Sequence, residues 1–371
     1  MFDTSRRPIV LVWELTRACG LACEHCRADA QPQRHPDELT TAEGRSLLAD
    51  AREFGSGQIV VLSGGDPLAR DDVPELVAHG AELDLRVSVT PSGIDSLTPA
   101  RIHELAEAGL DRMALSFDGA RPATHDAFRG EAGSFASTRA AAEAARDSGI
   151  GLQVNTTVCA STVDELPAIR ELVADLDAVR WSVFFLVPVG RGRVLDPIEP
   201  ARADEVMRWL HEVKRAASFA VETTEAPQFA RVGLQERGVD PADARRPGVL
   251  AGDGFAFVSH VGEVYPSGLL PQSVGNVRDG SLVDCYRETP LFESLRDRDG
   301  FRGKCGACPY REVCGGSRSR AFATTGDPLA ADPLCPFVPE GYDGPLPRGE
   351  NASTHARGVG PGGDDGGIGA D

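Results

Sequence analysis

Short runs of Val, Ile and Leu alternate with longer amphipathic segments from residue 9 to about residue 187. A buried parallel strand reads as a short apolar run, whereas a covering helix repeats its apolar positions every three or four residues, so the alternation predicts an α/β fold built from βα units. Right-handed crossovers would wrap these units into a barrel or an open barrel. The predicted strands are residues 9–13, 58–62, 85–89, 112–116, 152–156 and 181–185, and the predicted helices include 41–54, 99–108, 134–148, 163–176 and 202–217.

The alternation stops near residue 226, where a segment punctuated by Gly and Pro begins. Residues 255–259 and 263–265 flank Gly262 and predict a β-hairpin. From residue 341 the chain consists largely of Gly, Asp, Pro and Arg without a hydrophobic period, which predicts disorder. We therefore expect a core domain at residues 1–225, a smaller irregular cysteine-rich domain at 226–340 and a disordered tail at 341–371.

The chain is strongly acidic, with 56 Asp and Glu against 38 Lys and Arg and a formal net charge of −18. Such a chain repels phosphate groups, so neither nucleic acid nor an anionic membrane is an expected partner. Lys214 and Lys304 are the only lysines. An acid excess of this kind is typical of proteins from salt-loving organisms such as haloarchaea, because concentrated salt screens the repulsion. A GC-rich genome would explain the missing lysines but not the acid excess.

The chain has nine cysteines and no segment that suggests export. No apolar stretch is long enough to span a membrane, and the run at residues 9–13 is too short for the core of a signal peptide. A cytoplasmic location is therefore expected, and thiols stay reduced there. Metal ligation explains the cysteines better than disulfides do, and an odd number cannot all pair.

Three cysteines, Cys19, Cys23 and Cys26, follow the first predicted strand with the spacing CxxxCxxC. Structural zinc and ordinary iron-sulfur clusters use four protein ligands, so three thiolates leave one coordination position open. The alternative of three buried core cysteines is disfavoured because the loop contains Gly and charged residues.

This loop resembles the hallmark of the radical S-adenosylmethionine (AdoMet) enzymes, which carry it after the first strand of a partial (β/α)6 barrel. The resemblance implies a [4Fe-4S] cluster on Cys19, Cys23 and Cys26, with S-adenosylmethionine bound to the open iron. One electron from the reduced cluster would then release methionine and a 5′-deoxyadenosyl radical that takes a hydrogen atom from the substrate. His25 stands where the family more often has an aromatic residue, and a packing role is favoured over metal ligation.

Other segments at predicted strand ends match further elements of the family, and none of them supplies a catalytic acid or base. Gly64, Gly65 and Asp66 resemble the GGEP-like element that binds the cofactor ammonium, with Asp in place of Glu. Glycines there permit close backbone approach, and a carboxylate suits an ammonium group.

The fourth predicted strand ends in Leu115-Ser116-Phe117-Asp118-Gly119, which resembles the family's SxDG element. The resemblance implies that Ser116 and Arg129 hold the cofactor carboxylate, although the spacing between them is one residue longer than usual. Asn155, at the end of the fifth strand, is a candidate for the ribose hydroxyls or a plain strand-end cap.

Four further cysteines, Cys305, Cys308, Cys314 and Cys335, are grouped closely enough to close a metal site. Their spacing does not separate zinc from iron-sulfur. The segment resembles SPASM domains, which extend radical AdoMet enzymes and hold auxiliary [4Fe-4S] clusters. A full domain holds two, but Ser267 and Arg318 replace cysteines of the inner site. The resemblance implies one auxiliary cluster, with electron transfer as its role. Cys159 is expected in the core, and Cys285 as an ordinary cysteine.

Three functions remain open. The retained auxiliary site and the hairpin around His260 are most similar to enzymes that modify haem side chains, which implies a porphyrin substrate; His260 itself is expected to face solvent. Maturation of a ribosomal peptide is the second hypothesis, and only eight residues precede the first strand where a peptide-recognition domain is common. A non-catalytic metal-binding or electron-carrying protein is the third. An electron donor such as ferredoxin or flavodoxin is an expected partner of the enzyme.

Overall fold

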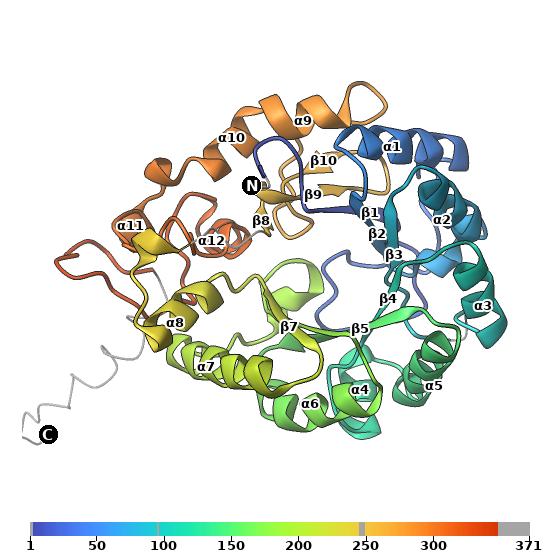
Figure 1. Ribbon diagram of the computed structural model, residues 1–371, viewed down its shortest axis with the longest axis horizontal. Helices are drawn as coiled ribbons and strands as arrows, with labels where there is room; N and C mark the ends of the chain where they lie inside the picture. The colour runs from blue at the N-terminus through green and yellow to red at the C-terminus, as the bar shows by residue number, and fades with distance from the viewer. Residues whose placement is uncertain (1–2, 95, 245–248, 348–371) are drawn as a thin grey trace, which may run out of the picture.

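The computed structural model describes residues 3–94, 96–244 and 249–347. Seven parallel strands form a curled half-barrel sheet in the order of the sequence, and helices cover its outer face (Figure 1). The six predicted strands are confirmed, and a seventh follows them. The strands are β1 (Val10–Thr16), β2 (Ile59–Gly64), β3 (Arg86–Val89), β4 (Arg112–Ser116), β5 (Gly151–Val158), β6 (Arg180–Phe185) and β7 (Ala220–Thr224).

The sequence pattern missed β7 because this strand has almost no apolar signal. Of its five residues only Val221 is buried; exposed Ala220 precedes it, and Glu222 and two threonines follow it. Its pairing with β6, in which Trp181 lies opposite Val221, keeps it in the sheet. Pairing with a neighbouring strand therefore determines the conformation of this segment, although its own residues do not favour a buried strand.

Helices connect the strands and pack their apolar faces on the sheet. Thr40 begins the first helix with a capping box in which Glu43 binds back to the Thr40 backbone. Gly44 on that helix lies against Trp13 of β1, where a Cβ atom would come within 2.3 Å of the indole ring. The helices are α1 (Thr41–Glu53), α2 (Val73–Glu82), α3 (Pro99–Glu107), α4 (Pro122–Arg129), α5 (Ser134–Asp147), α6 (Leu166–Asp175), α7 (Pro200–Ala216) and α8 (Gln228–Arg237).

Strand β5 shows how the sheet separates its core from a polar inner face. Leu152, Val154 and Val158 are buried, whereas Gln153 and Asn155, which alternate with them, are half-buried and polar. Because side chains point to opposite faces along a strand, one side packs on helices while the other leaves polar groups free to face a ligand.

The C-terminal segment continues the same sheet. The predicted hairpin forms from β9 (Gly254–Val258) and β10 (Val264–Tyr265), and β9 pairs in parallel with β1. The domain boundary at residue 226 thus stays a prediction, and residues 348–371 of the predicted disordered tail lie outside the described residues. The remaining elements are β8 (Leu250–Ala251), α9 (Leu282–Glu288), α10 (Pro290–Arg296), α11 (Gly303–Gly306) and α12 (Arg318–Thr325).

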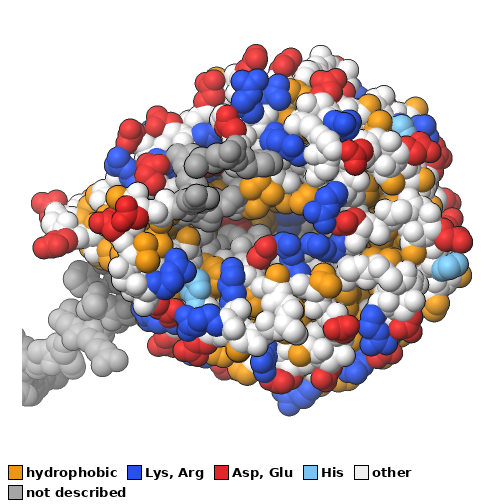
Figure 2. Space-filling view, viewed as in Figure 1, with side chains coloured by type: hydrophobic (Ala, Val, Ile, Leu, Met, Phe, Trp, Pro, Cys, Tyr) orange, Lys and Arg blue, Asp and Glu red, His pale blue; other side chains and the backbone are white. Residues whose placement is uncertain are grey.

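The surface carries the charge that the composition predicts. Figure 2 shows acidic side chains scattered over one face and along its edge, with several basic side chains around the hollow at its centre. Within the described residues, no helix combines the length and the hydropathy that a membrane crossing requires.

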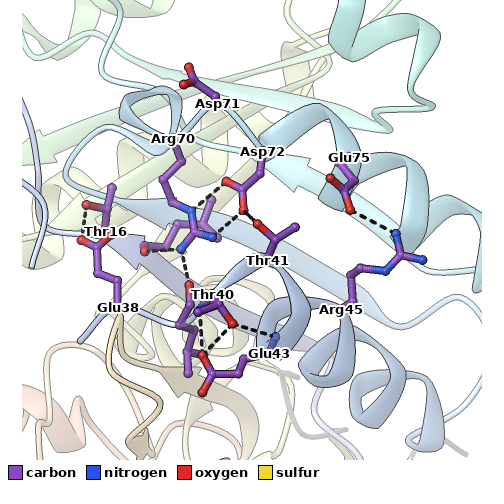
Figure 3. Close-up of polar contacts among 12 residues, drawn as sticks. Thr16, Glu38, Thr40, Thr41, Glu43, Arg45, Arg70, Asp71, Asp72 and Glu75 are labelled. Atoms are coloured by element: carbon purple, nitrogen blue, oxygen red, sulfur yellow. Dashed lines mark hydrogen bonds and ion pairs between the residues drawn. The ribbon is translucent and has the colours of Figure 1, made fainter. Parts of the chain in front are cut away.

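Arg70, which is 1% exposed, ties the carboxyl ends of the first two strands to α1 (Figure 3). Its guanidinium donates to the carbonyl oxygens of Leu15 (3.3 Å) and Leu39 (2.7 Å). It also forms a two-pronged pair with Asp72 at 2.9 and 2.6 Å, and Thr41 donates to the same carboxylate. One buried cation therefore satisfies acceptors from three separate segments.

We expect Arg70→Met to lower the free energy of unfolding by about 3 kcal/mol, because it removes the charged partner of the Asp72 carboxylate and the donor to two carbonyls. The matched control is Arg45→Met, since Arg45 pairs with Glu75 at 3.2 Å on the surface and such pairs contribute roughly 0–1 kcal/mol. Denaturant unfolding of both variants measures the difference. Equal losses in the two variants would contradict the role given to Arg70.

Candidate functional site

Cys19, Cys23 and Cys26 lie in the loop after β1, at the carboxyl ends of the parallel strands, where barrels of this kind build their sites. Cys23 is buried, and the other two thiols are half-buried. Burial, together with the neighbouring Asp66, Cys23 and Cys26, raises the pKa of Cys19 to about 11. The three thiols therefore lie close enough to influence one another, and ionising them together needs nearby positive charge.

The loop after β2 rests directly on the cysteine loop. The backbone N–H of Gly65 donates to the Thr16 carbonyl at 2.8 Å, and that of Asp66 donates to the Ala18 carbonyl at 2.7 Å. A Cβ atom on Gly65 would lie 2.4 Å from the Ala18 oxygen, and one on Gly64, whose φ is +140°, would lie 2.2 Å from the Thr16 oxygen. Both positions therefore require glycine because the backbone at the end of β1 and in the loop after it lies so close. The expected approach to the cofactor stays a prediction.

Asp66 is buried beside Cys19, and its carboxylate holds the loop after β3. It accepts hydrogen bonds from the Ser92 backbone N–H (3.3 Å) and the Ser96 hydroxyl (2.6 Å). It also caps the short helix that follows it by accepting from the Leu68 N–H. A carboxylate is thus fixed next to the cysteine loop, at the position expected for the cofactor ammonium.

Arg129 and Asp118 form a buried pair against Cys23. The Arg129 guanidinium lies 2.9 Å from the Asp118 carboxylate and 3.7 Å from the Cys23 sulfur. Burial opposes ionisation of Asp118, but Arg129, the two neighbouring histidines and the Thr157 N–H together hold the pKa of this carboxyl below its usual value. The sequence motifs predict that Arg129 binds the cofactor carboxylate and give Asp118 no role. The ion pair between these two residues is therefore seen only in the structure.

Ser116, the last residue of β4, lies opposite Asn155 of β5. Asn155, expected at a strand end, instead lies within β5, because the strand continues to Val158, and it is therefore not a strand-end cap. The Asn155 side chain accepts a hydrogen bond from Gln153 at 2.8 Å.

His25 packs flat on Phe128, with ring centroids 4.7 Å apart. Burial lowers the pKa of His25 to about 4, so the stacked ring is neutral at neutral pH.

Buried polar atoms without a partner adjoin the cysteine loop. Among the described residues, His25 Nδ1, Ser92 Oγ and Arg129 Nε have no hydrogen-bond partner. A ligand with polar groups would satisfy such atoms, which otherwise carry a desolvation cost. These atoms, the glycine cradle and the grouped thiols fit an iron-sulfur cluster with a polar small molecule on it. No three described side chains converge tightly enough for a single metal ion, whereas a cubane, being wider, separates its thiolates.

A segment that sequence reasoning missed holds the cysteine loop from the other side. Arg191, in the short helix Gly190–Val194 after β6, donates through its backbone N–H to the Cys26 carbonyl (3.0 Å). Its side chain donates to the carbonyls of Cys23 (3.0 Å) and Ala30 (3.2 Å). The available signal was the Gly-Arg-Gly-Arg run, which begins at Gly190, a few residues after β6 ends at Phe185.

The second cysteine group is more deeply buried than the first. Cys305, Cys314 and Cys335 are buried and Cys308 is half-buried. Burial and the neighbouring Cys305 raise the pKa of Cys335 to about 12, which Arg231 partly offsets. Thiols that raise one another's pKa in this way become thiolates readily only with a metal.

The two residues that replace cysteines have structural places. Ser267 is buried in the turn after β10, and its hydroxyl accepts from the Leu269 N–H. Arg318 is buried in α12 and donates to the carbonyls of Pro328 (2.9 Å) and Ala330 (2.8 Å). Cys159 is buried as expected, and Cys285 is half-buried.

A cavity of about 230 Å³ opens between the cysteine loop, the segment after β6 and the C-terminal hairpin. Its wall includes the guanidinium-bearing Arg17, Arg27 and Arg193 and the rings of Phe257, Tyr265 and Phe322. His260, expected to face solvent, is instead buried behind this wall and lies 2.9 Å from Glu14 of β1. The prediction for His260 was wrong because the hairpin packs on β1, a long-range contact that leaves no local signal.

The comparisons with known proteins agree with this geometry. The radical SAM superfamily profile matches residues 13–173. The AdoMet-dependent heme synthase of Methanosarcina barkeri is 38% identical over 348 residues, which cover 91% of this chain and 99% of the relative. The chain belongs to the radical SAM superfamily.

The chain is also similar to a peptide cyclase and to a solved structure. A PqqA peptide cyclase from Methylocella silvestris is 33% identical over 90% of this chain and 88% of its own length. The crystal structure of Streptococcus suis SuiB bound to S-adenosylmethionine has a TM-score of 0.70 at 16% identity, covering 90% of this chain and 78% of that one, which shows a common fold. As a radical SAM enzyme, the chain uses a [4Fe-4S] cluster and S-adenosylmethionine.

In this radical SAM enzyme, Gly65→Ala tests the contact between the two loops. We expect AdoMet affinity to fall roughly tenfold or more, because overpacking against rigid backbone costs about 1–3 kcal/mol. The control is Gly280→Ala, which adds a methyl group with nothing within 4 Å. Equilibrium AdoMet binding to anaerobically reconstituted protein measures both. Wild-type affinity in Gly65→Ala would show that the close approach is dispensable.

Proposed function

We propose that this chain modifies carboxylate-bearing side chains of a tetrapyrrole, with one radical SAM cluster and one auxiliary [4Fe-4S] cluster. The observation that carries the substrate class is the cavity beside the cysteine loop, which combines three arginines with three aromatic rings. Guanidinium groups pair with carboxylates, and aromatic rings contact a flat apolar macrocycle. The 38% identity to an AdoMet-dependent heme synthase supports the same class.

The residues around the first cysteine group divide the work of cofactor binding. Cys19, Cys23 and Cys26 would hold the cluster, and bound AdoMet would supply a 5′-deoxyadenosyl radical that removes a hydrogen atom from the substrate. Gly64, Gly65 and Asp66 are proposed for the cofactor ammonium, and Ser116 and Asn155 for its other polar groups. Arg129, anchored by Asp118 at 2.9 Å, keeps a buried positive charge beside Cys23, which favours the thiolate form.

Cys305, Cys308, Cys314 and Cys335 are the proposed ligands of the auxiliary cluster. Four thiolates satisfy four irons, so this cluster has no open corner for substrate, and electron transfer is the role that remains. Arg231 and the buried thiols influence one another electrostatically, and a cation at that position stabilises the reduced cluster. A ferredoxin or flavodoxin is the expected class of external electron donor.

Peptide maturation is the second candidate, because a PqqA peptide cyclase is 33% identical to this chain. It is less well supported by the cavity. An extended peptide binds through backbone hydrogen bonds along a strand edge, whereas three clustered guanidinium groups call for a ligand rich in carboxylates.

The substrate class is tested with reduced, reconstituted enzyme. Incubation with AdoMet and iron-coproporphyrin is expected to give 5′-deoxyadenosine well above the substrate-free level, together with a porphyrin product of changed mass. Liquid chromatography with mass spectrometry measures both. A precursor peptide of the PqqA type serves as the competing substrate, and 5′-deoxyadenosine that depends on the peptide but not on the porphyrin would overturn the proposal.

The cluster count is tested by an iron assay. Wild-type protein is expected to hold ~8 irons, and Cys19→Ala and Cys305→Ala are each expected to keep ~4, since each removes a ligand of a different cubane. Cys285→Ala is the matched control and should keep ~8, because Cys285 lies on α9 outside both groups. Zinc in place of iron, or the loss of iron in Cys285→Ala, would contradict the assignment.

A further inference from the structure

The cavity gathers positive charge in a chain whose net charge is −18. Arg17, Arg27 and Arg193 line it, and none of the described residues on its wall is acidic. Two acids lie behind the wall: Glu14 contacts the first two arginines, and Glu263 accepts a hydrogen bond from the Tyr265 hydroxyl. An acidic surface around a basic hollow attracts anions into the hollow alone.

Glu14 is fully buried and contacts two of the cavity arginines. Its carboxylate lies 2.9 Å from the Arg27 guanidinium, 3.2 Å from Arg17 Nε and 2.9 Å from His260 Nδ1. Burial opposes its ionisation, but Arg27, His260 and Arg17 together lower its pKa to about 2. Each arginine therefore contacts Glu14 through one nitrogen, and its other N–H groups are left to bind a ligand. The Arg27 guanidinium is also stacked 4.7 Å above the Phe257 ring.

Arg193 differs from the other two. Its side chain makes no hydrogen bond or ion pair with the described part of the chain, and it is exposed on the short helix Gly190–Val194. The same helix carries Arg191, which holds the cysteine loop. The backbone that carries Arg193 is therefore held against the cysteine loop, and its exposed side chain is within reach of a ligand in the cavity.

We propose that the cavity binds two substrate carboxylates, one between Arg17 and Arg27, which Glu14 aligns, and one at Arg193, with Phe257, Tyr265 and Phe322 contacting the ring system between them. This inference rests on the proposed function and names its binding site. At about 230 Å³ the cavity is smaller than the ~300–1,000 Å³ of typical small-molecule sites. It therefore accommodates one edge of a tetrapyrrole, with two neighbouring carboxylate side chains, rather than the whole macrocycle. Glu14 acts as a positioning residue.

The test compares two forms of one probe. Iron-coproporphyrin and its methyl ester, which has the same ring system without carboxylates, are titrated by absorbance against reconstituted protein in the same detergent, without reductant. Wild-type protein should bind the acid form at least tenfold more tightly. Arg17→Gln and Arg193→Gln should each weaken binding of the acid form roughly tenfold to a hundredfold, since each removes a charge-assisted hydrogen bond, and should leave ester binding unchanged. Arg45→Gln, on the exposed face of α1, is the matched control and should bind both forms as wild type.

Glu14→Gln separates positioning from net charge. The substitution makes the cavity more positive, so a site that reads charge alone would bind the acid form more tightly. If Glu14 aligns the two guanidinium groups, the acid form binds more weakly and Glu14→Asp restores part of the affinity. Tighter binding in Glu14→Gln would overturn the positioning role. The iron content of Glu14→Gln and Glu14→Asp shows whether these two variants fold. The arginine variants test the binding site independently of Glu14.

The outcomes distinguish failure of this inference from failure of the proposed function. Equal affinity of wild-type protein for the acid and the ester, or unchanged acid binding in both arginine variants, would overturn the two-carboxylate site even if iron-coproporphyrin triggers 5′-deoxyadenosine formation. No porphyrin binding of either form, together with peptide-dependent AdoMet cleavage, would overturn the proposed function and the inference with it.

Discussion

Backbone-to-backbone contact between the loops after β1 and β2 is the constraint on which the rest of the site depends. Gly65 and Asp66 donate from their backbones to Thr16 and Ala18, and no side chain larger than hydrogen fits at Gly65. This contact sets how far the cysteines stand from the residues proposed for the AdoMet ammonium. Arg70 supports it from behind by holding β1 and the loop after β2 together through buried hydrogen bonds.

The cysteine loop is held from other directions as well. The carbonyl of Phe128 accepts from the Glu24 N–H at 3.1 Å, and Arg191 binds the Cys23 and Cys26 carbonyls. These contacts come from the segments after β4 and β6, so the ends of several strands share the task of fixing one irregular loop. A parallel half-barrel suits this task because all of its strands end on the same side. The cost is a set of buried donors, such as Arg129 Nε, that find no hydrogen-bond partner among the described residues.

Much of this arrangement could be predicted from the sequence, because it follows from local patterns. Six strands are marked by short segments rich in apolar residues, Gly64 and Gly65 stand where two loops pass close to each other, and the cysteine spacing predicts a metal site. Strand β7 could not be predicted in the same way, since Glu222 and Thr223 are held in it by pairing with β6. The pairs Arg129–Asp118 and His260–Glu14 join residues of one buried site through tertiary contacts. Such contacts leave no periodic signal, and for His260 the local reading of an exposed hairpin was wrong.

The pairing of β9 with β1 explains why one cavity draws on both ends of the chain. Strand β1 leads into the cysteine loop on one side and carries Glu14, while β9 places Phe257 opposite Val12 in the same sheet. The hairpin therefore cannot shift relative to the cysteine loop without breaking strand hydrogen bonds. Because the aromatic wall and the proposed cluster ligands are both tied to β1, the proposed substrate, bound against Phe257 and Tyr265, would lie in a defined relation to the cluster. Hydrogen-atom transfer needs that fixed relation, since a misplacement of about 1 Å can cost a hundredfold in rate.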